Sequence, residues 1–208
     1  MPSLDWNRRW ARKLAGFVPG GSEGQHYGDR WGDPNTHPAL MAVRDRFVRP
    51  YARPGAVALE IGSGGGRWTQ FLAGCARIYC VELNREMFAA LTERFPDEPL
   101  VFVESGGTDI PGVPPASLDF AFSYGTLVHL ELDAIAAYLA SLAPLLKRGG
   151  QACLHVSDVR RPDGAAKDGF SDNDPARTAA LIERAGLVVR EIDDATLPHS
   201  AMIRAERP

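Results

Sequence analysis

The sequence is poor in cysteine, and the cysteines that it has do not form pairs. Its 208 residues include only Cys75, Cys80 and Cys153, with no CxxC spacing among them. An odd number of widely spaced cysteines argues against a disulfide framework. Cys80 and Cys153 lie in apolar runs, so we interpret them as small core residues of a protein from a reducing compartment.

Clustered positive charge and long apolar runs are also missing. The net charge is -3 and no long run of Lys or Arg occurs, so charge does not indicate a nucleic-acid partner. No apolar stretch approaches the ~20 residues that cross a bilayer. The N-terminus lacks the unbroken apolar region of a secretion signal. We therefore expect a soluble cytoplasmic protein with a small-molecule partner and no membrane partner. A homodimer stays open.

What the sequence does contain is an alternation of apolar runs with helical patterns. The predicted strands are Val57–Ile61, Arg77–Leu83, Leu100–Glu104, Leu118–Tyr124, Gln151–Val156, Leu187–Ile192 and Ser200–Ala205. The predicted helices among them are Trp68–Cys75, Arg85–Phe95, Asp133–Lys147 and Pro175–Ala185, and Gly149 and Gly150 are expected to cap the third. This alternation requires parallel strands joined by crossovers, hence an open α/β sheet covered on both faces. The last two strands have no helix between them, which predicts an antiparallel closing strand.

A second region, residues 1–50, precedes this pattern. Trp6, Trp10, Leu14 and Phe17 recur at helical spacing, and a further helical pattern begins at His37-Pro38. We expect an N-terminal helical lid over 1–50 and one domain over 51–208.

A glycine-rich turn follows the first predicted strand. Glu60-Ile61 runs directly into Gly62-Ser63-Gly64-Gly65-Gly66, and Glu82 ends the second predicted strand 20 residues after Gly62. Glycines let the backbone turn tightly and let a ligand approach it, and a carboxylate at that strand end can bind ribose hydroxyls. A plain turn with a solvated Glu is the alternative. The coincidence of strand, glycines, helix pattern and acid favours an adenosine-type ligand.

The glycine spacing distinguishes between cofactors. In the dinucleotide fingerprint G-x-G-x-x-G the third glycine would fall at Arg67. Glu60 stands two places before the first glycine, where a positively charged ligand group would be favoured and a pyrophosphate would not.

These residues resemble motif I of the class I S-adenosylmethionine-dependent methyltransferases. The similarity continues in order at Val81-Glu82-Leu83, at Ser117–Ser123 and at Leu145–Gly150, and it covers about residues 55–205. The resemblance implies a Rossmann-like, doubly wound, mostly parallel seven-stranded sheet with an antiparallel closing strand. It implies S-adenosyl-L-methionine as cofactor and S-adenosyl-L-homocysteine as product.

Cofactor-binding residues follow from the same resemblance. The positions that it assigns to the cofactor are Glu60, Gly62, Ser63, Gly64, Gly66, Glu82, Leu83, Gly107, Thr108 and Ser123. Glu82 would hold the ribose and Leu83 would pack on the adenine, with Gly107 or Thr108 offering a backbone amide. The family's usual adenine-binding Asp is replaced by glycine here, and Asp109 either substitutes for it or faces solvent.

The end of the fourth strand bears on the acceptor. Methyltransferases of adenine or glutamine amides carry Asn/Asp-Pro-Pro-Tyr/Phe there, whereas this chain has Ser123-Tyr124-Gly125-Thr126. Metal-dependent O-methyltransferases place an Asp at this end and an acidic pair after the fifth strand. Here residues 120–130 contain no Asp, and the pair Asp193-Asp194 lies near the sixth strand. These departures favour metal-free methyl transfer to oxygen.

Candidate catalytic and substrate residues surround the same strand ends. His129 is the candidate general base, because its near-neutral pKa suits proton removal, although it could instead cap the next helix. Asp158 would orient His129 or bind a sugar hydroxyl. The candidate substrate residues are Tyr27, Trp31, Tyr124 and His155. Tyr27 and Trp31 could equally pack against the N-terminal helix, and His155 could be a core residue.

The wider pattern resembles a bacterial branch associated with sugar or polysaccharide O-methylation. It comprises Tyr27, Trp31–Pro34, Gly66–Thr69 and Phe122–Leu130. Two other functions stay open: a non-catalytic S-adenosylmethionine-binding partner subunit, and a nicotinamide-dependent oxidoreductase, against which Arg67 already counts.

Overall fold

The computed structural model describes residues 8–9, 12–14, 16–17, 19–22 and 24–208. Residues 8–9 and 12–14 are helical. Trp6 and Trp10, on which the expected first helix partly depends, lie outside the described residues.

The core of the fold is a single seven-stranded sheet. Its strands are β1 (Val57–Ile61), β2 (Arg77–Glu82), β3 (Leu100–Glu104), β4 (Leu118–Ser123), β5 (Leu146–Ser157), β6 (Val188–Asp193) and β7 (Ser200–Glu206). Their order is β3-β2-β1-β4-β5-β7-β6. Strands β1 to β5 pair in parallel, while β7 runs antiparallel to both β5 and β6. The predicted antiparallel closing strand is confirmed, and it inserts between β5 and β6.

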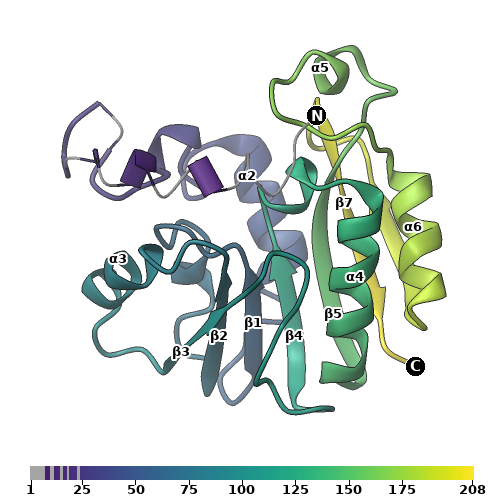
Figure 1. Cartoon of the computed structure of the whole chain (residues 1–208), viewed down its shortest axis with the longest axis horizontal. Coiled ribbons are helices and arrows are strands. Elements are labelled where there is room, and N and C mark those ends of the chain that lie inside the picture. The colour runs from purple at the N-terminus through teal and green to yellow at the C-terminus, as the bar shows by residue number, and fades with distance from the viewer. Residues whose placement is uncertain (1–7, 10–11, 15, 18, 23) are drawn as a thin grey trace.

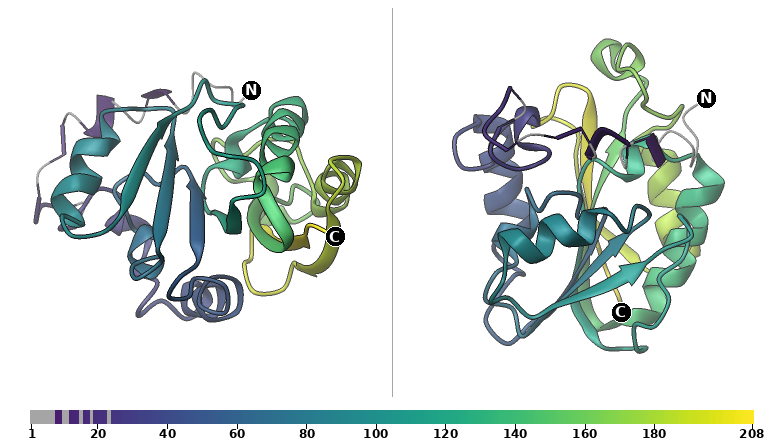
Figure 2. Two further views of the ribbon diagram at one scale, coloured as in Figure 1. Left: turned by 90° about the horizontal axis from the view of Figure 1, so that it is seen from below. Right: turned by 60° about the vertical axis from the view of Figure 1, so that its left-hand side comes forward.

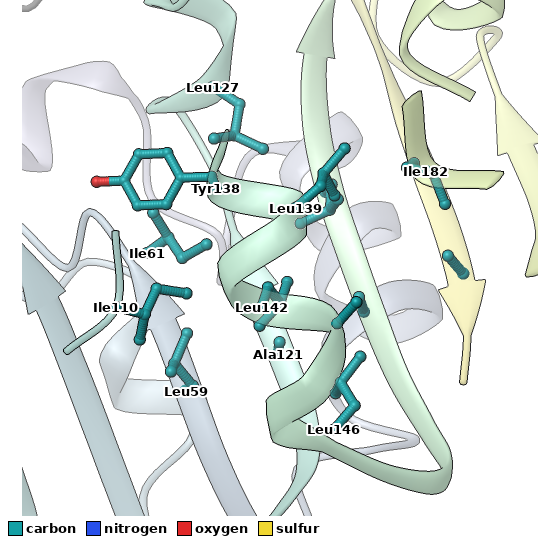
Figure 3. Close-up of a cluster of buried hydrophobic side chains, with 14 of the residues drawn as sticks. Leu59, Ile61, Ile110, Ala121, Leu127, Tyr138, Leu139, Leu142, Leu146 and Ile182 are labelled. Atoms are coloured by element: carbon teal, nitrogen blue, oxygen red, sulfur yellow. The ribbon is translucent and has the colours of Figure 1, made fainter. Parts of the chain in front are cut away.

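Both faces of the sheet are covered by helices. Successive strand residues point to opposite sides, so an apolar strand has apolar side chains to bury on each face. Leu59 and Ile61 of β1 belong to one apolar cluster, and Ala58 belongs to another. The helices on the first face are α4 (Leu132–Leu142) and α6 (Pro175–Arg184), whose leucine and isoleucine side chains meet the sheet in Figure 3. The second face is covered by α2 (Pro38–Val43), the π-helical turn Arg44–Val48 and α3 (Met87–Arg94). Figure 2 shows these layers from two further sides.

The predicted helix over Trp68–Cys75 is wrong. Only the 3-10 turn Thr69–Phe71 forms there. Trp68 and Leu72 are buried against the sheet, and Gly74 at φ +86° ends the segment. The apolar residues therefore fill a short connection between strands rather than a regular helix.

The predicted glycine cap at Gly149 and Gly150 is also wrong. Helix α4 ends at Leu142 and is followed by the 3-10 turn Ala143–Leu145, because Pro144 lacks the N–H that a longer helix needs. Strand β5 begins at Leu146, so both glycines lie within it, at a shift in its register with β4. The Gly149 N–H donates to the Arg207 carbonyl at 2.7 Å.

The strand order reverses between β1 and β4, and this places the ligand site. In open α/β sheets, ligands bind outside the carboxyl ends of the strands at such a switch point. The N-terminal segment, purple in Figure 1, lies above these ends on one side. The loop that carries α5 (Pro162–Ala165) rises beyond β5 on the other. Among the described residues, no helix combines the length and apolarity needed to cross a bilayer.

Candidate active site

A cavity of about 790 Å³ opens at the switch point. Its size lies within the range of about 300–1,000 Å³ that small-molecule sites span. The predicted site residues that line it are Tyr27, Trp31, Glu60, Gly62, Ser63, Gly64, Glu82, Leu83, Gly107, Tyr124, His129 and His155. The structure thus brings together in one cavity residues that are separated by more than a hundred positions in the sequence.

The glycine turn is shaped by close approaches of the backbone to its neighbours. A Cβ on Gly62 would lie 1.8 Å from Thr126 Oγ1, and one on Gly65 would lie 2.2 Å from the Tyr27 carbonyl oxygen. Gly64 differs, since no heavy atom lies within 4 Å of the position that a Cβ would take there, and it lines the cavity. Gly62 and Gly65 therefore pack the turn, and Gly64 leaves space for a ligand.

Glu60 is a buried carboxyl group at the floor of this turn. It is 2% exposed, and its Oε2 accepts a hydrogen bond from Thr69 Oγ1 at 2.5 Å. Burial raises the pKa of Glu60 to about 7, which the hydroxyl of Thr69 only partly offsets. A cationic ligand group beside this carboxylate would compensate for its desolvation.

Replacing Glu60 with Gln should make the stability of the ligand-free protein less sensitive to pH. The pKa rises from 4.5 in the unfolded chain to about 7 in the folded protein, so the folded state binds the proton more tightly. The stabilisation is complete below pH 4.5 and is lost as the pH rises towards 7, a change of about 3 kcal/mol. Urea unfolding of both proteins across this window measures the difference. Parallel stability curves for wild type and Glu60→Gln would contradict the assignment.

Glu82 is held at the end of β2 by the backbone. Its Oε2 accepts the Gly64 N–H at 3.0 Å, and its Oε1 accepts those of Leu83 at 2.9 Å and Asn84 at 3.3 Å. Burial raises its pKa nonetheless. A carboxylate offers about four acceptor sites, so these three bonds fix the side chain and leave room for a ligand hydroxyl.

The loop after β3 is fixed from within. Asp109 is exposed, and its Oδ1 accepts the Gly106 N–H at 2.6 Å. Of the two interpretations of Asp109, the structure favours the one in which it faces solvent. The Gly107 N–H, expected to contact adenine, donates to Ser105 Oγ at 2.9 Å. Gly107 still lines the cavity, whereas Thr108 does not.

His129 also lines the cavity, from the 3-10 turn Leu127–His129 after β4. Its Nδ1 donates to the Gly169 carbonyl at 2.7 Å, because a carbonyl oxygen can only accept. Helix α4 has Glu131 as its N-cap and no side-chain cap bond. The alternative interpretation of His129 as a helix cap is therefore wrong. Burial lowers the pKa of the imidazole.

Tyr124 and His155 form a stacked pair beside the glycine turn. Their ring centroids lie 4.0 Å apart with an interplanar angle of 12°. The Arg67 guanidinium lies 5.5 Å from the Tyr124 ring centroid, and its Nη1 donates to the Trp31 carbonyl at 2.8 Å. Burial raises the pKa of Tyr124 to about 12, so its hydroxyl stays protonated. Arg67 thus ties the N-terminal segment to the wall of the cavity.

Besides Thr108, three predicted residues have structural positions outside the cavity lining. Gly66 turns the chain at φ +83°, where a Cβ would lie 2.4 Å from the Phe95 ring. Ser123 is fully buried and donates to the Ile61 carbonyl at 3.1 Å, which ties β4 to β1. Asp158 is 1% exposed and binds Arg160 Nε at 2.8 Å. The prediction that Asp158 orients His129 is wrong, since the Gly169 carbonyl holds that ring.

Several lining residues were not predicted from the sequence. They are Asn84, Met87, Tyr138, Lys167, Asp168, Phe170 and His199, among others. Tyr138 looks like a core residue of α4, yet its hydroxyl bonds Ser105 Oγ at 2.9 Å and points away from the apolar cluster in Figure 3. Phe170 and His199 come from loops that have no recognisable motif. Within the described residues no group of three His, Cys, Asp or Glu could hold a metal ion.

The residues of the cavity fit an adenosine-type cofactor that carries a positive charge. Glu82 is the polar group that can bind a ribose, and it accepts the Gly64 N–H. Because Gly64 has no side chain, the space beside its backbone is open to the cofactor. The buried Glu60, with a neutral hydroxyl as its hydrogen-bond partner, suits a cationic group. This donor set and the strand order are those that the resemblance to class I S-adenosylmethionine-dependent methyltransferases implies.

Comparisons with known proteins support this class. Residues 59–154 match the family model described as a methyltransferase domain. An S-adenosylmethionine-dependent methyltransferase from Mesorhizobium loti has the same fold, with a TM-score of 0.68 at 16% identity over 84% of this chain and 100% of that one. The cofactor of the class, S-adenosyl-L-methionine, is the one predicted from the glycine turn.

Two further relatives differ in what they methylate. The 1,6-didemethyltoxoflavin-N1-methyltransferase of Burkholderia thailandensis has a TM-score of 0.64 at 21% identity, over 100% of this chain and 90% of that one. A ribosomal RNA small subunit methyltransferase A from Synechococcus is 36% identical over 84 residues, which are 39% of this chain and 29% of that protein. The chain thus spans about three tenths of the length of this curated relative.

Proposed function

We propose that this chain transfers the methyl group of S-adenosyl-L-methionine to a hydroxyl oxygen of a small molecule, with His129 as general base. The observation that carries the proposal is that one cavity holds both halves of the reaction. Glu60, Gly64 and Glu82 line the end that suits the cofactor. His129 lines the same cavity from the loop after β4.

The state of His129 supports its role as a base. Because Nδ1 donates to the Gly169 carbonyl, the lone pair of the neutral ring is on Nε2. Burial keeps the pKa of the ring below 6.5, so the neutral form dominates near neutral pH. Such a ring can accept the proton of an acceptor hydroxyl. When bound, the cofactor supplies the electrophilic methyl group.

The N-terminal segment covers the cofactor end of the cavity. The Tyr27 carbonyl packs on Gly65, and Arg67 donates to Trp31 and Gly32. We propose that residues 1–50 act as a lid on the domain formed by 51–208, which orders the site and limits the access of water. In this proposal Tyr27 and Trp31 line the cavity and also hold the N-terminal segment against the glycine turn.

The end of β4 supports a small-molecule acceptor over a nucleic acid. The sequence there is Ser123-Tyr124-Gly125-Thr126, without the prolines and amide of adenine methyltransferases. The net charge of -3 adds no support for RNA. The structural relative from Burkholderia acts on a small heterocycle, by its name. A sugar acceptor stays a prediction.

A transfer assay with methyl-labelled S-adenosyl-L-methionine tests the proposal. The acceptor panel holds sugars, hydroxylated aromatic compounds and small-subunit ribosomal RNA. We expect label on a small hydroxylated compound and none on the RNA. Label on the RNA alone would contradict the small-molecule assignment. Cofactor binding with no transfer to any acceptor would instead support a non-catalytic partner subunit.

A further inference from the structure

A chain of hydrogen bonds runs from the backbone after β4 to an unassigned histidine of the cavity. The Gly125 N–H lies 3.0 Å from His155 Nδ1. His155 Nε2 lies 2.7 Å from Ser200 Oγ, and Ser200 Oγ lies 2.7 Å from His199 Nδ1. His155 and His199 both line the cavity. Three side chains from β5, β7 and the loop between β6 and β7 are thus linked.

The first link fixes the proton on His155. A backbone N–H can only donate, so His155 Nδ1 must accept and cannot carry a proton. The proton of the ring is therefore on Nε2, which donates to Ser200 Oγ. His155 is 2% exposed and burial holds its pKa well below 6.5, which agrees with a neutral ring.

The second link fixes the proton on His199. Ser200 is fully buried, and its hydroxyl already accepts from His155. A buried hydroxyl proton without an acceptor is costly, and among the described residues the acceptor within reach is His199 Nδ1. His199 Nδ1 therefore accepts, and the proton of its neutral ring is on Nε2. Burial lowers the pKa of this ring too.

His129 and His199 consequently have opposite tautomers, and both contact the ring of Phe170. The Phe170 ring centroid lies 5.6 Å from that of His129 and 5.4 Å from that of His199, in both cases edge to face. His129 has its lone pair on Nε2, as the Gly169 carbonyl dictates. His199 has an N–H at the same ring position. His129 can therefore accept a hydrogen bond at Nε2, whereas His199 can donate one from Nε2.

We propose that His199 is a specificity-determining residue that donates its Nε2–H to the acceptor molecule, while His155 and Ser200 are positioning residues that set its tautomer. The substrate class that this arrangement selects has a hydroxyl group for His129 and a second oxygen or nitrogen with a lone pair for His199, such as a carbonyl, ether or ring nitrogen. This inference rests on the proposed function of the same site.

Long-range ¹H–¹⁵N NMR of the histidine rings tests the tautomers without knowledge of the acceptor. In the wild-type protein with S-adenosyl-L-homocysteine near neutral pH, we expect Nε2–H rings for His155 and His199 and an Nδ1–H ring for His129. Ser200→Ala removes the donor to His199, so His199 should change to a mixture of tautomers while His129 stays unchanged. A wild-type His199 with its proton on Nδ1, or no change in Ser200→Ala, would overturn the inference.

Kinetics of an acceptor found in the transfer assay test the contact itself. His199→Phe keeps a ring but loses the N–H, so the KM of the acceptor should rise about tenfold, the effect of one lost hydrogen bond. His199→Gln keeps an N–H donor and should restore most of the affinity. Both variants should bind S-adenosyl-L-homocysteine as the wild type does. Equal KM values in all three proteins would overturn the inference, whereas a wild type without cofactor binding would refute the proposed function instead.

Discussion

Replacing Gly64 with leucine should reduce the affinity for S-adenosyl-L-homocysteine about 100-fold. No heavy atom lies within 4 Å of the Cβ position at Gly64, which lines the cavity, so the leucine side chain would take the space that the cofactor needs. Forcing extra carbons into an occupied site costs up to about 3 kcal/mol, equivalent to roughly 100-fold in affinity. Isothermal titration calorimetry of the variant measures the loss.

Gly74→Leu is the matched control for this variant. Gly74 also has a positive φ, +86° against +52° for Gly64, and no heavy atom within 4 Å of its Cβ position, but it is exposed and outside the cavity. A leucine in left-handed backbone should destabilise both variants similarly, by about 1–2 kcal/mol. Only Gly64→Leu should lose the cofactor. Equal affinities in the two variants would show that the cofactor does not occupy the space over Gly64.

Replacing His129 with alanine should reduce turnover about 100- to 10,000-fold, the usual contribution of a general base. The Nε2 lone pair of the ring is the group that takes the acceptor proton, and alanine removes it. The variant should bind S-adenosyl-L-homocysteine nearly as the wild type does, since Glu60, Gly64 and Glu82 are unchanged. Initial rates at saturating cofactor measure the effect.

The pH dependence of the wild type adds a second readout for His129. Burial lowers the pKa of the ring below 6.5, so kcat/KM should fall with decreasing pH only below that value. His129→Gln should lose both the rate and this acid limb. Undiminished turnover in His129→Ala would remove His129 from the mechanism and leave the methyl donor site intact.

The fold was largely predictable from the sequence because its signals are local. Val57–Ile61 and Leu100–Glu104 are apolar runs with clear ends, and the structure gives both strands the predicted bounds. The connection after the glycine turn was mispredicted because Trp68 and Leu72 have helical spacing, yet the segment between β1 and β2 forms only a short 3-10 turn. The strand that begins at Leu146 was mispredicted because a glycine pair resembles a helix cap as much as a bulge.

The cofactor end of the site was predictable for a similar reason. Glu60 and Glu82 lie at the ends of the consecutive strands β1 and β2, and Gly64 follows β1. Parallel strands bring their carboxyl ends to one edge of the sheet. Ser123 also lies at the end of a parallel strand, but its hydroxyl donates to the Ile61 carbonyl instead of lining the cavity. The direction of that side chain could not be predicted from its place in the sequence.

The acceptor end was not predictable, because tertiary contacts between distant loops build it. Phe170 and His199 lie on loops without a motif, and they reach His129 only through ring contacts across the fold. Asp158 illustrates the converse. It directly follows β5 at the expected edge, yet the nearby Arg160 binds the carboxylate, which lies outside the cavity lining.

Calorimetric titration of the wild-type protein with S-adenosyl-L-homocysteine and, separately, with NAD tests the central claim most directly. The glycine turn with Arg67 in place of a third glycine, the buried Glu60 and the anchored Glu82 together predict binding of S-adenosyl-L-homocysteine at one site per chain and no binding of NAD. Tight binding of NAD, with none of S-adenosyl-L-homocysteine, would contradict the account.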